Sequence, residues 1–243
     1  MRYIIVIFII LTIARPAHAE CVVLLHGLGR TAQSMEKLRA RLGEEGYNTV
    51  NYDYPSRKYP IEKLAETVIP DALSLCRDDA QVSFVTHSLG GILVRQYLAN
   101  HKIPNLHRVV MLGPPNKGSE VVDALKNFPG FHLINGDAGG QLGTDTQSVP
   151  GRLGKADFDL GIIAGTTTIN LILSMIIPGV DDGKVSVART RLDGMADHIE
   201  MIGSHPFLMK DDKIIEQVVH YLVNGHFNRT AAVVEPTHIS MGD

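Results

Sequence analysis

Residues 82–91 read Val82-Ser83-Phe84-Val85-Thr86-His87-Ser88-Leu89-Gly90-Gly91 and form the most informative pattern of the chain. The run 82–86 is rich in β-branched and aromatic residues, which is typical of a buried strand. The segment 92–100, directly after the two glycines, predicts a helix. A serine at such a sharp turn from strand to helix has its hydroxyl lifted clear of the sheet, so Ser88 is predicted to be a nucleophile.

The match to this turn has one departure. Glycine usually stands two residues before the serine, and here that position is Thr86. Threonine is still small enough for a tight turn, and Gly90 lets the strand and the helix approach each other. The alternative is a surface serine in a glycine-rich turn, but the order of strand, turn and helix favours the nucleophile.

A second glycine-containing loop, His26-Gly27-Leu28-Gly29, follows the apolar run 21–25. Backbone N–H groups in such a loop can point into a cavity and stabilise the negative oxygen that forms during acyl transfer. We predict that the donors are the N–H groups of Leu28 and of Leu89, the residue after the serine. Their side chains are expected to line the floor of the pocket.

A serine hydroxyl becomes nucleophilic when a histidine removes its proton and a carboxylate orients that histidine. His205 is the predicted base, because it follows the short predicted strand 197–202 and opens the last helix. His198 lies inside that strand, and His87 is expected to point away from the serine. The remaining candidates carry no motif and are predicted to lie at the surface: His101, His107, His220 and His226.

Together these motifs resemble those of the α/β-hydrolase superfamily, and more narrowly those of small bacterial secreted lipases and esterases. The resemblance covers residues 20–225 and includes Asp182-Gly183-Lys184-Val185 and Gly203-Ser204-His205. It implies an α/β fold with a mostly parallel central sheet, helices on both faces and an irregular insertion over the active site. The chain order of oxyanion loop, serine, acid and histidine agrees with that family.

The resemblance also selects the acid. In related hydrolases the acid stands directly before a turn glycine, with an apolar residue three places after the acid. This pattern favours Asp182 over Asp181. An ordinary Asp-Gly turn is the alternative, and a calcium site is disfavoured because no alternating-oxygen loop is present.

The composition suits one domain and limits the partners. The chain has 243 residues, of which 44% are hydrophobic and 20% charged, and a net charge of -3 without a basic cluster. This argues against nucleic acid as a partner. The sequence predicts an ester or lipid substrate and no cofactor or metal, and it leaves the oligomeric state open.

The first nineteen residues have the pattern of a secretory signal peptide. Arg2 supplies the positive charge, residues 4–13 are almost entirely apolar, and Ala17-His18-Ala19 fits a cleavage site. Cleavage after Ala19 predicts a secreted or periplasmic protein without a stable membrane span. Retention as an uncleaved anchor is the alternative, whereas Glu20 argues against a lipid attached at the following cysteine.

The hydrolase domain is predicted over residues 20–225, with a polar tail at 226–243. Within it, the glycine-rich insertion 114–157 is expected to be irregular and to act as a lid or cleft wall. The apolar segment 169–178 is either core or an apolar wall beside the acid. The side chains expected to face the wall formed by 169–178 are Phe128, Phe131 and Leu133. The remaining helices are expected over 31–43, 61–77 and 211–223, and the remaining strands over 47–52, 108–112 and 158–164.

In the implied fold, the helix 61–77 runs back across the first strand, so Cys76 approaches Cys21 on the side away from the active site. A disulfide is therefore plausible, and an oxidising compartment would preserve it. It would stabilise the fold by about 3–4 kcal/mol in the chain-entropy model. Two separate buried thiols are the alternative.

The function predicted from these features is serine hydrolysis of carboxylic esters, as in a lipase or esterase. The same residues would also serve an acyltransferase, in which an alcohol replaces water. A peptidase or amidase, and a non-catalytic binding or folding factor on the same scaffold, remain as further alternatives. The length of the acyl chain and the head group are not predicted.

Overall fold

The computed structural model describes residues 20–77 and 80–230. These residues form a six-stranded sheet of order β2-β1-β3-β4-β5-β6, in which every neighbouring pair is parallel. The strands are β1 (Cys21–Leu25), β2 (Asn48–Tyr52), β3 (Val82–His87), β4 (Leu106–Leu112), β5 (Leu160–Gly165) and β6 (Asp197–Met201). The predicted signal peptide lies outside the described residues.

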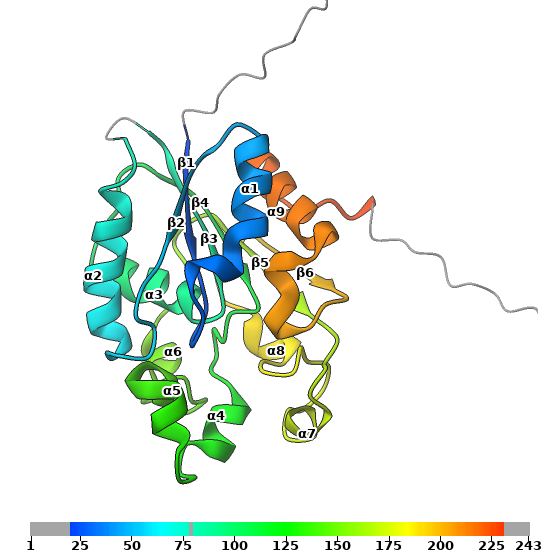
Figure 1. Cartoon of the computed structure of the whole chain (residues 1–243). Coiled ribbons are helices and arrows are strands. Elements are labelled where there is room, and N and C mark those ends of the chain that lie inside the picture. Colours follow the sequence, from blue (N-terminus) through cyan, green and yellow to red (C-terminus); the bar gives the residue numbers. More distant parts are fainter. Residues whose placement is uncertain (1–19, 78–79, 231–243) are drawn as a thin grey trace, which may run out of the picture.

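Helices cover both faces of this sheet (Figure 1). On one side lie α1 (Glu36–Glu44) and α9 (Asp212–Asn224), and on the other lie α2 (Ile61–Leu73) and α3 (Leu89–Leu98). The alternation of strand side chains explains the two layers, because successive residues point to opposite faces. Val22 and Leu24 join the core cluster of α1 and α9, whereas Val23 and Leu25 join that of α2 and α3. The predicted α/β fold is confirmed.

Helix boundaries differ slightly from the sequence prediction. The helix expected over 31–43 is a 3₁₀ turn, η1 (Ala32–Met35), followed by α1. The helix expected over 61–77 already ends at Leu73. The last helix begins at Asp212, because the Asp211 side chain accepts hydrogen bonds from two N–H groups of its first turn.

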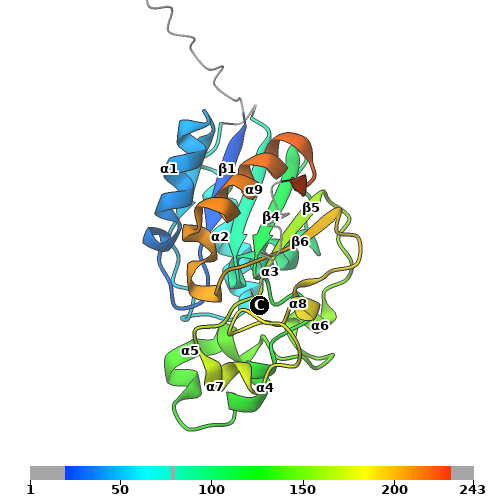
Figure 2. The ribbon, with the colours of Figure 1, turned by 90° about the vertical axis from the view of Figure 1, so that its right-hand side faces the viewer.

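The insertion after β4 is helical, which corrects the expectation of an irregular segment. It contains α4 (Glu120–Leu125), α5 (Phe131–Gly140) and α6 (Val149–Arg152). These helices lie with α7 (Leu171–Ser174) beyond the carboxyl ends of the strands (Figure 2). They escaped prediction because they are short, and because α5 is kinked at Gly136, where the backbone has φ 63°. The kink interrupts the helical periodicity on which sequence patterns depend.

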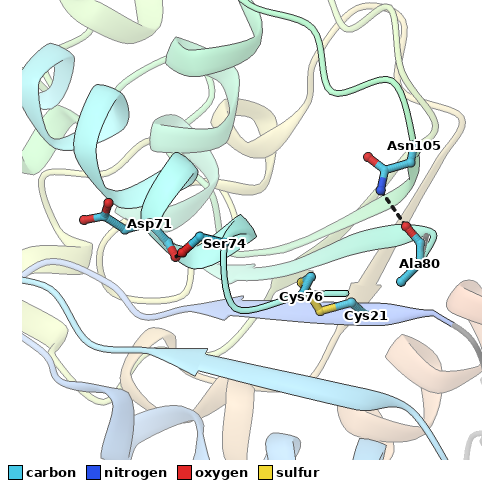
Figure 3. Close-up of a disulfide and its surroundings, with 6 residues drawn as sticks. All are labelled: Cys21, Asp71, Ser74, Cys76, Ala80 and Asn105. Carbon is cyan, nitrogen blue, oxygen red and sulfur yellow. Dashed lines mark hydrogen bonds between the residues drawn. A yellow bond between two sulfur atoms is a disulfide. The ribbon is translucent and has the colours of Figure 1, made fainter. Parts of the chain in front are cut away.

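Of the two alternatives left open for the cysteines, the disulfide is the one observed. Cys21, at the start of β1, is bonded to Cys76, which follows the end of α2 (Figure 3). Because the strands are parallel, this bond lies at the amino-terminal end of the sheet. The opposite end carries Ser88 and the helices of the insertion.

The folded part of the chain continues past residue 225, where the sequence placed its boundary. Phe227 is 1% exposed and packs against Tyr221, with ring centroids 4.8 Å apart. Its backbone N–H donates to Asp197 Oδ2 over 2.8 Å.

Among the described residues, no helix is long and apolar enough to span a membrane. Along the chain, β6 is preceded by a short helix, α8 (Val187–Thr190), and followed by a second 3₁₀ turn, η2 (His205–Lys210).

Candidate active site

Ser88 occupies a strained turn between β3 and α3. Its backbone has φ 51° and ψ -116°, and in residues 20–77 and 80–230 it is the one non-glycine residue with positive φ. The Ser88 N–H donates to the carbonyl of Leu112 over 2.9 Å, which ties the turn to the end of β4. Strain of this kind persists only where the surrounding structure fixes it, and it is concentrated at functional sites.

Close packing around the turn explains its small residues. A Cβ atom on Gly90 would lie 2.7 Å from the carbonyl oxygen of Leu25, so this position requires glycine. Thr86, the departure from the usual pattern, is fully buried. It is accommodated opposite Gly91, where a Cβ atom would lie 3.1 Å from Thr86 Oγ1 and 2.9 Å from Met111 Sδ.

The structure brings the three predicted side chains into one hydrogen-bonded chain. His205 Nε2 lies 3.0 Å from Ser88 Oγ, and His205 Nδ1 lies 2.7 Å from Asp182 Oδ2. All three residues are buried, with 8%, 7% and 1% of the surface of Ser88, His205 and Asp182 exposed. With the Nδ1 proton directed at the carboxylate, Nε2 is free to accept the serine proton.

Backbone groups hold Asp182 in place. Its Oδ1 atom accepts hydrogen bonds from the N–H groups of Lys184 over 3.0 Å and Val185 over 2.9 Å. The N–H of His205 also donates to the Asp182 carbonyl over 2.8 Å, which links acid and base through the main chain. These bonds satisfy a buried carboxylate that would otherwise be costly to desolvate.

Asp181, the competing acid, has a different position. Its carboxylate accepts from the Gly183 N–H over 2.7 Å and from the Ser174 hydroxyl over 2.6 Å. These bonds close the turn before α8 and connect it to α7. The geometry therefore favours Asp182, in agreement with the choice made from the sequence.

Gly113 is a site position that the sequence analysis missed. It directly follows β4 and has φ 54°, and a Cβ atom there would lie 2.8 Å from Asp182 Oδ2 and 3.1 Å from His205 Nδ1. A side chain at this position would push acid and base apart. The sequence offered no signal for it, because the contact joins residues distant along the chain.

His87 makes its contacts with His205, and among the described residues no hydrogen bond joins its ring to Ser88. Its Nε2–H donates to the backbone carbonyl of His205 over 2.9 Å, and the two rings lie 4.8 Å apart. Burial lowers the pKa of His87 well below its usual value, and the neighbouring His205 and Arg30 act in the same direction. His87 is therefore neutral and helps to fix the segment that carries His205. Its Nδ1 atom is buried without a partner among the described residues.

The loop predicted to hold the oxyanion is rigidly supported. The His26 ring stacks on Tyr54 at 4.1 Å, and its nitrogens bond the Gly27 carbonyl at 2.9 Å and the Tyr54 N–H at 3.3 Å. Burial lowers the pKa of His26, which keeps the ring neutral. Leu28 lines the same cavity as Ser88, whereas the Leu89 side chain is fully buried in the core. The expectation of a pocket floor therefore holds for Leu28 and is wrong for Leu89.

The other histidines lie outside this arrangement. His198 Nε2 bonds Thr190 Oγ1 at 2.9 Å, and burial lowers its pKa to about 4. His101 and His226 are exposed, and His107 and His220 are half-buried. Within the described parts of the chain, no cluster of histidine, cysteine or acidic residues could hold a metal ion.

A cavity of about 330 Å³ opens beside Ser88 and His205. Its apolar wall comes mainly from the insertion and the oxyanion loop: Leu28, Val121, Val122, Leu125, Phe131 and Leu142. Phe131 thus faces the cavity as expected, whereas Phe128 and Leu133 are not among its lining residues and are 63% and 86% exposed.

The apolar segment 169–178 is a rim of this cavity and not core. Ile169 and Leu173 line the cavity. Leu171 and Met175 are 74% and 82% exposed, whereas Ile177 is buried. Of the two alternatives left open by the sequence, the apolar wall is therefore the one observed.

Comparisons with known proteins agree with the fold. Residues 22–220 match the alpha/beta hydrolase family. None of the curated proteins matches the chain. A lipase from Bacillus licheniformis in its mature form is similar in structure, with a TM-score of 0.64 and 22% identity over 85% of this chain and 93% of the lipase.

Two further solved structures resemble the chain. A metagenomic carboxyl esterase has a TM-score of 0.59 and 16% identity, covering 78% of this chain and 65% of the esterase. A thioesterase from the prodiginine biosynthetic pathway of Streptomyces coelicolor has a TM-score of 0.53 and 16% identity, covering 87% and 96%. At these identities the likeness concerns the fold alone.

Proposed function

The chain belongs to the alpha/beta hydrolase family, and we propose that it cleaves carboxylic esters through Ser88, His205 and Asp182. The observation that carries this proposal is the continuous hydrogen-bonded chain from Ser88 Oγ through the His205 ring to Asp182. A buried serine in a strained turn, with a base at 3.0 Å, matches the requirements of an activated nucleophile. Lipases and esterases among the similar structures support the same class of reaction.

The reaction follows from this geometry in two halves. Ser88 Oγ attacks the acyl carbonyl while His205 Nε2 takes the hydroxyl proton, and Asp182 stabilises the imidazolium that forms. His205 then gives this proton to the departing alcohol, which leaves the acyl group on Ser88. In the second half, His205 removes a proton from water, and the resulting attack releases the acid and restores the serine.

The negative oxygen of each tetrahedral intermediate needs fixed donors. We assign these to the backbone N–H groups of Leu28 and Leu89, which flank Ser88 from the oxyanion loop and the start of α3. Because His26 and Tyr54 hold the loop through stacking and hydrogen bonds, its donors need no rearrangement when charge develops.

The substrate proposed for this site is an ester with an apolar acyl chain. The side chains of α4 and α5 that line the cavity suit such a chain, and the exposed residues of α7 extend the apolar surface at its mouth. A lipase is therefore the finer form of the proposal. No cofactor enters the steps above.

We further propose that the protein is exported, with a signal peptide cleaved after Ala19. The disulfide between Cys21 and Cys76 supports this location, because disulfides persist in oxidising compartments. Residues 1–19 are outside the described structure, so the support comes from their sequence pattern and from the disulfide.

The test is a series of p-nitrophenyl esters from acetate to palmitate, hydrolysed by the purified protein and by Ser88→Ala. We expect activity to fall by about a thousandfold or more in Ser88→Ala. Ser119→Ala is the matched control, because this second serine lines the same cavity and lies outside the hydrogen-bonded chain. An optimum at long chains would support a lipase and one at short chains an esterase of small esters. Activity that survives in Ser88→Ala would refute the proposal, and transfer to an added alcohol instead of water would indicate an acyltransferase.

A further inference from the structure

Two cationic side chains line the cavity beside Ser88. Arg30 follows the oxyanion loop, and Lys184 lies two residues after Asp182. Among the described residues, neither side chain takes part in an ion pair or a hydrogen bond. Both residues thus line the cavity without an ion-pair partner, and both are exposed.

Elsewhere in the described structure, many cations are paired with carboxylates, such as Arg189 with Glu120 at 2.8 Å and Arg152 with Glu62 at 2.8 Å. In the described part of the chain, no carboxylate forms an ion pair with Arg30 or Lys184, and Asp182 acts on Lys184 through its charge alone.

The two cations are close enough to influence their surroundings. Burial lowers the pKa of Lys184, the charge of Arg30 lowers it further, and the charge of Asp182 acts in the opposite direction. Arg30 also helps to lower the pKa of His87, inside the same cavity. Two like charges held near each other raise the free energy of the empty cavity, and a bound anion would relieve their repulsion.

The acidic groups nearby do not neutralise this pair. Asp182 is the one carboxylate that lines the cavity, and its oxygens are engaged by His205 and by two backbone N–H groups. Asp53 lines the neighbouring groove, where it accepts from the Ala32 N–H over 2.7 Å and lies 3.4 Å from His26 Nε2. The mouth of the cavity thus remains positively charged.

A second hollow shares a lining residue with this cavity. It has a volume of about 630 Å³ and is lined by Arg30, Arg57 and Lys58, so Arg30 belongs to both spaces. The apolar side chains of α4 and α5 also line the cavity and suit the acyl chain. The cationic side chains are therefore left for the alcohol part of the ester.

We propose that the natural substrate is an ester whose alcohol part carries a phosphate group, bound by Arg30 and Lys184. The guanidinium of Arg30 offers paired donors that match phosphate oxygens, and Lys184 supplies a second point charge. This inference rests on the proposed ester hydrolysis and specifies its substrate class. The reaction remains hydrolysis, in which water and the ester give a carboxylic acid and a phosphate-bearing alcohol.

The test compares two soluble esters with the same acyl chain, 1-hexanoylglycerol 3-phosphate and neutral 1-hexanoylglycerol, on the purified full chain. We expect kcat/KM to favour the phosphate ester by about tenfold or more at low salt, and the preference to shrink at high salt. In Arg30→Gln and in Lys184→Gln the ratio of the two kcat/KM values should fall by about tenfold. Lys102→Gln, with the same loss of charge at an exposed residue of the loop before β4, should keep the wild-type ratio.

A second measurement covers the case in which one variant does not fold. Hexyl phosphate should inhibit hydrolysis of p-nitrophenyl hexanoate competitively in the wild type, and hexanol should inhibit it more weakly. The inhibition constant of hexyl phosphate should rise by about tenfold in whichever cation variant folds.

The outcomes separate the two proposals. Ser88-dependent hydrolysis of both hexanoyl esters at equal rates, or a preference that survives in both cation variants, would overturn the phosphate inference and leave ester hydrolysis intact. Absence of Ser88-dependent hydrolysis of these esters and of p-nitrophenyl hexanoate would overturn the proposed function, and the inference with it.

Discussion

At the amino-terminal end of the sheet, the Cys21–Cys76 disulfide ties β1 to the segment after α2, and the Asn105 amide donates to the Ala80 carbonyl (Figure 3). At the carboxyl-terminal end, Ser88 has a strained backbone, and His87 Nδ1 is buried without a partner among the described residues. The first end is closed by covalent and polar bonds, and the second end opens into a cavity.

This difference indicates that stability and chemistry are separated along the strands. A reactive site needs strain, open space and unsatisfied polar groups, all of which cost stability. The amino-terminal end contributes the compensating bonds, including Arg108 with Asp159 at 3.2 Å and the hydrogen bond from the Tyr221 hydroxyl to Asp159. Variants at the two ends should therefore affect different measurements.

The largest effect is expected for Asp182→Asn at the carboxyl-terminal end. The amide cannot stabilise the imidazolium of His205, so kcat for ester hydrolysis should fall by about 10³- to 10⁴-fold. The thermal midpoint should change little, because the amide keeps the volume of the carboxylate. Asp181→Asn is the adjacent control and should keep activity within about tenfold of wild type. An equal loss of activity in both variants would show that the assignment of the acid to Asp182 is wrong.

The next effect concerns stability at the other end. Cys21→Ser removes the disulfide and should lower the free energy of unfolding by about 3–4 kcal/mol in urea denaturation. The kcat of the folded protein should stay at the wild-type value, because the bond is at the far end of β1 from Ser88. Cys76→Ser should give the same loss, and the double variant should add little to it. A large fall in kcat of a fully folded cysteine variant would show that the two ends of the sheet are coupled.

His87→Phe should give a smaller effect, on activity. It keeps an aromatic ring and removes the hydrogen bond to the His205 carbonyl, which positions the base. We expect kcat to fall by about tenfold, with KM nearly unchanged, since the loss of one buried hydrogen bond costs about 1.4 kcal/mol. His87→Gln retains a donor and should restore part of kcat. An unchanged kcat in His87→Phe would show that His87 does not position His205.

The smallest effect is expected at the rim of the cavity. Phe131→Ala removes part of the apolar wall and widens the cavity. The ratio of kcat/KM for long acyl chains to kcat/KM for short ones should therefore change by about threefold to tenfold. Leu133→Ala is the matched control, because this neighbour in α5 is 86% exposed and does not line the cavity. Equal changes in both variants would show that the wall does not select the acyl chain.

The sequence predicted the central arrangement because parallel strands place their carboxyl ends together. Ser88, Asp182 and His205 each follow a predicted strand or lie in a loop beyond one, so the chain order was enough to predict their contact. The approach of Cys21 and Cys76 followed from the same topology. In each case a local pattern and a fold rule pointed to the same answer.

Contacts between distant segments were beyond these patterns. The orientation of His87 depends on the backbone of His205, and the need for glycine at 113 depends on acid and base packing against it. Phe227 was assigned to a tail because its neighbours are polar, yet it packs on Tyr221. Tertiary packing determines such features, and a single sequence carries no periodic signal for them.

The most direct test of the account is to label the nucleophile with a reagent that phosphorylates activated serines. The protein is reacted with diisopropyl fluorophosphate, digested, and examined by mass spectrometry for an adduct. We predict a single adduct on the peptide that contains Ser88, absent in Ser88→Ala and formed far more slowly in His205→Ala. Ester hydrolysis by a protein whose Ser88 stays unmodified, or inactivation through another residue, would contradict the account.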